Sequence, residues 1–184
     1  MTHPKCKKQY ALDGLIACFE YKTIVKKLIY KYKYKPYISD LKTPIGTLMV
    51  ESLNENELFY SITNHNPLFV PVPLSIKRER ERGYNQSALI AEYVAQYFNM
   101  NYASLLERTK NTQPQYQLKK DQRRSNVSGV FKIADRDKKQ IFGRTIVVVD
   151  DIATSCSTLA ECAKVLKREG KARAVWGLVF AREV

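Results

Sequence analysis

The sequence predicts an α/β domain built on a parallel sheet flanked by helices, and three consecutive segments indicate it. "RTIVVVD" (144–150) is a continuous β-branched run, typical of a parallel strand buried on both faces. "TLAECAKVLKRE" (158–169) predicts a helix with Leu159, Cys162, Ala163 and Leu166 on one face, and "ARAVWGLVFA" (172–181) predicts another buried strand. Together they form a βαβ unit, whose crossover we expect to be right-handed.

The boundaries of this helix also have sequence signals. Thr158 and Glu161 have the spacing of a capping box, in which the side chains of both residues bind backbone N–H groups at the helix start. Gly170 is expected to end the helix.

Length and charge limit the class of protein. The 184 residues are most simply one domain over 1–184 with its own core. The formal net charge of +13 indicates an anionic partner such as nucleic acid, a phosphate-rich small molecule or an anionic surface, or else a well-solvated basic surface. No signal peptide and no membrane span are recognisable, so we expect a cytoplasmic protein with reduced cysteines. His3 and Cys6 are only half of a metal site, so no metal site is predicted.

The first 45 residues are a basic extension with a predicted strand and helix. "LIACFEY" (15–21) suits a short strand. An apolar helical stripe follows, with five lysines off it; the stripe consists of Tyr21, Ile24, Val25, Leu28, Ile29 and Tyr32, and the lysines are Lys22, Lys26, Lys27, Lys31 and Lys33. "YKYKYKPY" (30–37) interleaves Lys and Tyr, which indicates either nucleic-acid contact or core tyrosines beside snorkelling lysines.

The middle of the chain predicts further elements. We expect a helix within 38–53, a loop or frayed helix over 54–67, and a strand in "PLFVPVPLS" (67–75). "NQSALIAEYVAQYF" (85–98) predicts a helix capped by Asn85 or Ser87, with a buried face of Leu89, Ile90, Tyr93, Val94 and Tyr97. The polar, basic segment 109–128 has almost no periodicity, and a loop of that length is usually functional or disordered.

Paired acids and hydroxyls follow the buried strand in "VVVDDIATSCST" (147–158). Asp150 and Asp151 stand at the carboxyl end of the strand, where open α/β sheets bind ligands. The residues 154–158 lead into a helix N-terminus, whose free N–H groups attract phosphate. A ribose 5-phosphate suits both halves, because its vicinal hydroxyls can donate to the acids. The alternative is structural, since Asp at strand ends and Ser/Thr before helices are common caps.

Several enzyme classes are excluded by missing motifs. The dinucleotide fingerprint, the P-loop, the zinc-protease H-E-x-x-H and the nucleophile elbow G-x-S-x-G are all absent. A receiver domain needs a phospho-accepting Asp well downstream of its acid pair, and no Asp follows Asp151.

Four segments resemble known family patterns. "VVVDDIATSCST" resembles the phosphoribosyl pyrophosphate (PRPP) motif of type I phosphoribosyltransferases, an apolar run followed by D-D-[apolar]-x-T-T-G-x-T. "VPVPLSIKRERERGYNQSALIAEYVA" (70–95) and "RTKNTQPQYQLKKDQRRSNVSGVF" (108–131) resemble the ComF-family segments V-P-V-P…R-G-[FY]-N-Q and R-x-x-N-V-x-G-x-F. "LDGLIACFEYKTIVKKLIYKYKYK" resembles that family's N-terminal stretch, so the resemblance covers residues 12 to 182.

The resemblance implies a type I phosphoribosyltransferase-like sheet and assigns roles to residues. Asp150 and Asp151 would hold the ribose hydroxyls, and Arg123 would join them in catalysis. The 5-phosphate would be wrapped by Ala153, Thr154, Ser155, Cys156, Ser157 and Thr158. The pyrophosphate, with its magnesium ion (Mg²⁺), would face Lys77, Arg78 and Arg82; the segment 109–128 would be a lid carrying Arg123, Arg124 and Asn126.

The implied function is PRPP binding and phosphoribosyl transfer, in a family associated with DNA uptake in natural transformation. Competence-machinery proteins and single-stranded DNA would then be partners. The alternatives are a single-stranded DNA-binding competence factor without catalysis, or a PRPP-sensing regulator, on the same scaffold.

Two departures from the family pattern stand out. Family members often begin with a four-cysteine zinc ribbon, of which only Cys6 remains, so we expect no zinc. Cys156 replaces the glycine of T-T-G, either as a reactive thiol at a helix N-terminus or as a small residue tolerated in a relaxed loop.

Overall fold

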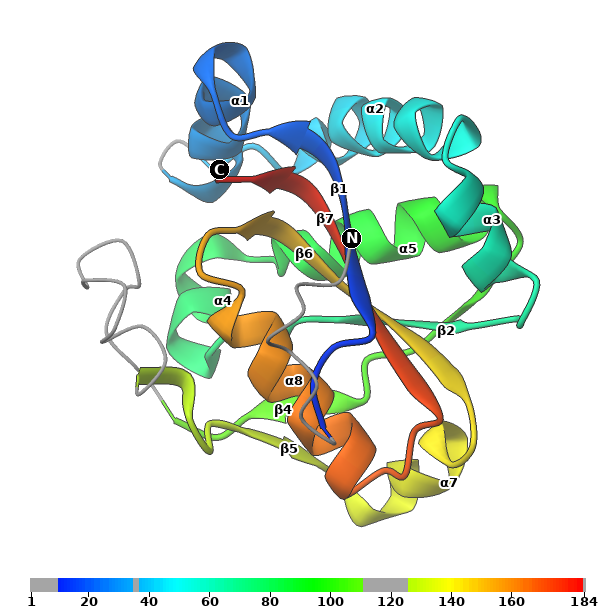
Figure 1. Ribbon diagram of the computed structural model, residues 1–184. Coiled ribbons are helices and arrows are strands. Elements are labelled where there is room, and N and C mark those ends of the chain that lie inside the picture. Colours follow the sequence, from blue (N-terminus) through cyan, green and yellow to red (C-terminus); the bar gives the residue numbers. More distant parts are fainter. Residues whose placement is uncertain (1–9, 35–36, 111–125, 184) are drawn as a thin grey trace.

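The computed structural model describes residues 10–34, 37–110 and 126–183. It contains a five-stranded sheet in the order β1-β7-β6-β2-β3, and all four pairings are parallel. The strands are β1 (Gly14–Glu20), β2 (Leu68–Pro71), β3 (Asn101–Tyr102), β6 (Thr145–Ala153) and β7 (Ala174–Arg182). Helices lie on both sides of this sheet (Figure 1), so the predicted α/β class with a flanked parallel sheet is confirmed.

Strands β6 and β7 form the centre of the sheet, as their β-branched runs predict. Strand β6 pairs with β2 on one side and with β7 on the other, and its residues 145–149 are all buried. Helix α8 (Ser157–Arg168) connects the two central strands. Its predicted face is confirmed, because Leu159, Cys162, Ala163 and Leu166 are buried.

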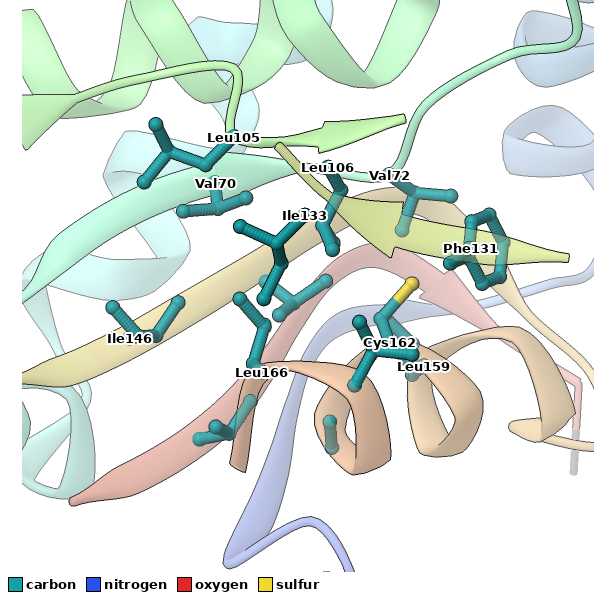
Figure 2. Close-up of a cluster of buried hydrophobic side chains, with 14 of the residues drawn as sticks. Val70, Val72, Leu105, Leu106, Phe131, Ile133, Ile146, Leu159, Cys162 and Leu166 are labelled. Atoms are coloured by element: carbon teal, nitrogen blue, oxygen red, sulfur yellow. The ribbon is translucent and has the colours of Figure 1, made fainter. Parts of the chain in front are cut away.

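Two apolar layers cover the faces of the sheet. On one face lie α2 (Lys42–Asn54), α3 (Glu57–Thr63) and α5 (Gln86–Tyr97). On the other face lie α8 and an antiparallel hairpin of β4 (Leu106–Arg108) and β5 (Phe131–Ile133). Figure 2 shows this second layer, in which Leu159, Cys162 and Leu166 of α8 pack toward side chains of the hairpin and the sheet. The sheet is thus buried on both faces, as parallel sheets usually are.

The N-terminal segment is part of the main sheet rather than an appendage to it. Strand β1 pairs in parallel with β7, and α1 (Thr23–Lys33) follows it. Only Ile29 and Tyr32 of the predicted apolar stripe are fully buried, and Ile24 is 75% exposed. Helix α1 therefore packs against the molecule mainly through its C-terminal half, and Val25 and Leu28 are partly buried against the same core.

Helix α5 is rotated relative to the prediction. Ile90 and Val94 are buried as expected, but they share the buried face with Ala91 and Ala95, whereas Tyr97 is exposed. The small alanines allow the helix to lie close to its neighbours. The Tyr93 ring packs instead on Gly46 of α2, where an added Cβ would lie 2.3 Å from it.

The start of α8 corrects the predicted capping box. Cys156, not Thr158, is the N-cap residue, and its side chain makes no capping hydrogen bond. The Glu161 carboxylate accepts a hydrogen bond from the Gly129 N–H at 2.9 Å instead. This bond ties α8 to the segment preceding β5.

The remaining elements are short. Residues 54–67, expected to be a loop or frayed helix, contain α3 with Asn56 as its cap, and the strand predicted at 67–75 is limited to β2. The others are η2 (Ser39–Leu41), α4 (Ile76–Arg82), η4 (Asp135–Asp137) and α7 (Lys138–Ile141). Within the described ranges, no helix has the length and apolar character needed to cross a bilayer.

Candidate functional site

A cavity of about 580 Å³ lies at the carboxyl end of β6. Its walls come from α1 and the segment after it, the segment after β2, α4, the start of α5, β4, and the turn between β6 and α8. Nine residues predicted for the site line it: Arg78, Arg82, Asp150, Asp151, Ala153, Thr154, Cys156, Ser157 and Thr158. The fold therefore brings together residues from two motifs that are about seventy residues apart in the chain.

Five other predicted residues are not among those that the structure places at the cavity, for two different reasons. Lys77, Ser155 and Asn126 are described but do not line the cavity. Arg123 and Arg124 lie outside the described residues, as does most of the predicted lid 109–128. Cys6, on which the zinc expectation depends, also lies outside them.

Asp150 is the partly exposed acid of the pair. Its Oδ1 accepts a hydrogen bond from the Ser87 hydroxyl at 2.8 Å and another from the Asp151 backbone N–H at 2.9 Å. Burial, followed by the charge of Asp151, raises the pKa of Asp150 to about 7. Lys33 and the two hydrogen bonds oppose this rise. Asp150 thus changes charge near neutral pH.

Asp151 is buried and carries an ion pair. The Lys33 ammonium lies 2.8 Å from Asp151 Oδ1. Burial opposes the charge on Lys33, but the two carboxylates outweigh it and raise the pKa of Lys33. The sequence grouped Lys33 with four other lysines that lie off the apolar stripe of α1, and the structure separates it from them, because its side chain is only 23% exposed. Asp151 nevertheless lines the cavity, so the ion pair is part of the site.

The turn after β6 has the backbone shape that the family glycine would favour. Cys156 has φ 56° and ψ 10°, which is the left-handed region that few side chains adopt. The Ser155 and Ser157 hydroxyls share a hydrogen bond of 2.9 Å. Cys156, Ser157 and Thr158 face the cavity where α8 begins, so helix N–H groups and hydroxyls lie at one wall.

Arginines lie on the cavity wall formed by other elements. Arg78 and Arg82 come from α4, and Arg108 comes from the end of β4. The Arg108 guanidinium lies over the Phe131 ring, 5.6 Å from its centroid. Burial, and next the charge of Arg78, lowers the pKa of Arg108. Two positive charges therefore repel each other here, and an anion bound between them would relieve that repulsion.

The segment "RGYNQS" (82–87) organises the site rather than only lining it. Gly83 ends α4 in the left-handed region at φ 81°. Asn85 caps α5 by accepting from the Ser87 N–H at 3.1 Å, and its amide donates to the Val72 carbonyl at 3.0 Å. These contacts fix Ser87 beside Asp150.

The same segment holds the end of α1. The Tyr84 hydroxyl and the Gln86 amide both donate to the Tyr32 carbonyl, at 3.0 and 3.2 Å. The Tyr32 hydroxyl donates to the Gln86 carbonyl at 3.3 Å. We call these three residues the α1 clamp.

Sequence reasoning missed several lining residues, notably Lys33, Ser87 and Arg108. Lys33 and Lys31 both lie off the apolar stripe in the sequence. Only the packing of α1 shows that Lys33 faces the cavity and that Lys31 is exposed. Arg108 and Ser87 lie within the segments that resemble the ComF patterns, but the arginine precedes the patterned positions and the serine follows them.

The residues of the acid pair do not fit a resident magnesium ion. Mg²⁺ favours an octahedral set of oxygen ligands, and in proteins it is usually held by one or two carboxylates plus substrate phosphates. Here Asp151 is paired with Lys33, and the Asp150 oxygen accepts two hydrogen bonds. In the part of the chain that the structure describes, no cluster of three or more His, Cys, Asp or Glu side chains could hold a metal ion.

Comparison with curated proteins finds competence and DNA-utilization proteins. The chain is 35% identical over 114 residues to competence protein F of Haemophilus influenzae, covering 61% of this chain and 49% of that protein. It is 35% identical over 111 residues to the DNA utilization protein YhgH of Escherichia coli (strain K12), covering 59% and 47%. It is 32% identical over 115 residues to competence protein ComFC of Bacillus subtilis, covering 62% and 44%.

These matches confirm the resemblance to ComF proteins predicted from the motifs. The chain spans about half the length of the curated relatives it matches. No protein-family model matches the chain.

Comparison with solved structures finds two chains of low similarity. The crystal structure of TT1426 from Thermus thermophilus has a TM-score of 0.40 and 17% identity, covering 75% of this chain and 72% of that chain. Adenine phosphoribosyltransferase from Leishmania donovani has a TM-score of 0.38 and 12% identity, covering 94% and 86%.

Proposed function

We propose that the cavity binds PRPP or ribose 5-phosphate and that the chain is a phosphoribosyltransferase-like protein. One observation carries the proposal. Two adjacent carboxylates, a left-handed turn leading into α8, and three arginines from other elements all line one cavity. A ligand that satisfies all three parts has vicinal hydroxyls, a phosphate at a distance from them, and a second anionic group.

The acid pair and the turn would bind opposite ends of the sugar phosphate. Ionised Asp150 and the second oxygen of Asp151 accept hydrogen bonds from the ribose hydroxyls. The 5-phosphate lies at the start of α8, where N–H groups lack intrahelical partners and the helix dipole favours negative charge. The hydroxyls of Ser157 and Thr158 add donors at the same wall.

The arginines would bind the pyrophosphate. In phosphoribosyl transfer, the bond between the anomeric carbon and pyrophosphate breaks as the acceptor's bond forms, and negative charge grows on the departing group. Arg78, Arg82 and Arg108 are fixed positive charges for that group. Mg²⁺ enters this proposal as a companion of the pyrophosphate, so it belongs to the ligand rather than to the chain.

A second candidate function rests on a different surface. Helix α1 exposes Lys26, Lys27 and Lys31 beside Tyr30, whose ring lies 4.8 Å from that of Tyr34. Lysines next to exposed aromatic rings suit single-stranded DNA. The relatives are named for competence and DNA utilization. A competence factor that binds DNA or competence-machinery proteins, with PRPP as substrate or as a regulatory signal, is compatible with both surfaces.

Calorimetry tests the PRPP proposal directly. PRPP with Mg²⁺, and ribose 5-phosphate alone, are titrated into the parent chain, Asp150→Asn and Asp135→Asn. We expect binding by the parent and a loss of about tenfold or more for Asp150→Asn, since a charge-assisted hydrogen bond is lost. Asp135 is exposed on η4, so its variant is the matched control. No binding of either ligand by the parent would refute the proposal.

A further inference from the structure

We infer that the Lys33 ammonium is the permanent counter-ion of Asp150 and Asp151. The ribose of the ligand then binds to these two acids without a divalent metal ion bound to them. This inference rests on the proposed function for the identity of its ligand. It assigns Lys33 a specificity role in the site and replaces a metal ion by an ammonium group of the chain itself.

The position of Lys33 is defined by its contacts. It is the last residue of α1, and its ammonium reaches Asp151, 118 positions further along the chain, at 2.8 Å. The Asp151 side chain is 5% exposed, so this pair is largely shielded from water. A contact of that length in a shielded place is both a hydrogen bond and an ion pair.

The α1 clamp (Tyr32, Tyr84 and Gln86) holds Lys33 in that position. Two side chains of the 82–87 segment bind the carbonyl of Tyr32, the residue before Lys33. The Tyr32 hydroxyl in turn donates a hydrogen bond to the Gln86 carbonyl. Gln86 is next to Ser87, which donates to Asp150. One segment therefore positions the polar partners of both acids.

The charges of the three groups depend on one another. Lys33 lowers the pKa of Asp150, and both acids raise the pKa of Lys33. Removing the ammonium would take from Asp151 the cation that contacts it and leave that carboxylate beside a second one in a shielded place, which proteins avoid by taking up a proton or a cation. A divalent ion at the acids would have to displace an ammonium that is already paired and held by α1. The site in its native form therefore has little need for such an ion.

The arrangement leaves acceptors for the ligand. Lys33 uses one oxygen of Asp151, so the other oxygen and Asp150 still face the cavity. Two ribose hydroxyls can donate to them while Lys33 offsets one of the two negative charges of the ionised pair. A cation fixed by the fold requires no reorganisation when the sugar binds.

Direct titration with Mn²⁺ tests the inference without any sugar phosphate. Binding is followed by electron paramagnetic resonance of free Mn²⁺ for the parent, Lys33→Met, Lys33→Arg and Lys31→Met. We expect Lys33→Met to gain a Mn²⁺ site that the other three proteins lack, and Lys33→Met/Asp151→Asn to lose it again. Lys31 lies on the same helix but is exposed, which makes it the matched control. A Mn²⁺ site in the parent, or none in a folded Lys33→Met, would overturn the inference.

Titration with ribose 5-phosphate tests the consequence for the ligand, because this sugar lacks the pyrophosphate that chelates metals. The parent and Lys33→Arg should bind it equally well, within about twofold, in magnesium and in EDTA. Lys33→Met should lose about tenfold in EDTA, from the loss of one charge-assisted contact, and recover in magnesium. A parent that binds only with magnesium would overturn the inference and leave the proposed function standing. If the parent binds no sugar phosphate under either condition, the proposed function fails, and the Mn²⁺ titration alone decides the role of Lys33.

Discussion

The Ser87 hydroxyl donates a hydrogen bond of 2.8 Å to the Asp150 carboxylate, from the first turn of α5 to the end of β6. The bond favours the ionised form of an acid whose burial and acidic neighbour favour the neutral form. Because the pKa of Asp150 is about 7 with this bond in place, Ser87 helps to set the pH at which Asp150 changes charge.

The first prediction concerns the pH dependence of ligand binding. Ribose hydroxyls need an ionised acceptor, so the affinity for ribose 5-phosphate should fall as the pH drops below about 7, the pKa of Asp150. Ser87→Ala removes a bond that lowers this pKa, so the midpoint should move up, by about one unit. Calorimetry at several pH values measures the midpoint. Ser104→Ala, which changes an exposed serine, should leave it unchanged.

The second prediction concerns stability. The pKa of Asp150 is raised in the folded protein from 3.8 to about 7, so between these values the folded chain keeps a proton that the unfolded chain has lost. The contribution of Asp150 to the free energy of unfolding should therefore decrease as the pH rises from about 4 to about 7. Asp150→Asn should remove that decrease, a difference on the order of 4 kcal/mol above neutral pH for a shift of about three pKa units.

Urea unfolding of the parent and Asp150→Asn at pH 5 and pH 8 measures this difference. Relative to the parent, the free energy of unfolding of Asp150→Asn should be higher at pH 8 than at pH 5. Equal differences at both pH values would contradict the raised pKa. Asp135→Asn, at an exposed acid whose pKa is lowered by its hydrogen bond to Lys138, controls for the loss of any carboxylate.

The third prediction tests the α1 clamp. Tyr84→Phe removes the hydroxyl that donates to the Tyr32 carbonyl and keeps the ring, which lies 5.7 Å from the Tyr32 ring. The free energy of unfolding should fall by about 1 kcal/mol. The rate of backbone amide hydrogen exchange should increase more in α1 than in α8. Tyr60→Phe, on the exposed side of α3, should change neither measurement appreciably, and an equal loss in both variants would contradict a role for the clamp.

The central strands could be predicted because their signals are local. The run 144–150 is apolar on both faces, and the helix after it has one apolar face, so the βαβ unit needed no information from the rest of the chain. The start of α8 could not be read in this way. Its capping-box spacing is present, but Gly129, 32 residues upstream, binds Glu161 and removes the side chain from the cap.

The site was predictable where a motif lies in one segment and not where partners are distant. Asp150, Asp151 and the turn after them are consecutive, and the structure places them at one cavity. Lys33 comes from a helix in which several lysines look alike, and its role depends on how far α1 is buried. Similarly, the buried face of α5 turned toward its alanines because neighbouring elements approach closely there.

The fourth prediction concerns DNA. Single-stranded DNA should bind weakly to α1, with an affinity that falls steeply as salt increases, because phosphate contacts release counterions. Lys27→Glu/Lys31→Glu should reduce this affinity. Lys139→Glu/Lys171→Glu makes the same change in net charge at exposed positions elsewhere and should have a smaller effect. Fluorescence anisotropy at several salt concentrations provides the measurement, and binding that is insensitive to salt would rule out this surface.

The fifth prediction concerns Cys156. A non-glycine residue at φ 56° costs about 1 kcal/mol relative to glycine, and the side chain stands where a phosphate would approach the backbone. Cys156→Gly should therefore tighten the binding of PRPP, while the stability of the fold changes by no more than about 1 kcal/mol, since glycine also loosens the unfolded chain. Calorimetry and urea unfolding measure the two quantities.

Alkylation of the parent places Cys156 relative to the ligand. Cys156 lines the cavity, whereas burial raises the pKa of Cys18 to about 12 and raises that of Cys162 as well, so iodoacetamide should modify Cys156 before those two. PRPP should slow this modification if the thiol and the ligand share the turn. If Cys156→Gly binds PRPP no better than a parent without detectable binding, the turn has kept the shape of a phosphate loop but not its function. The DNA-binding or regulatory role of the chain would then be the leading explanation, because it depends on α1 and not on this turn.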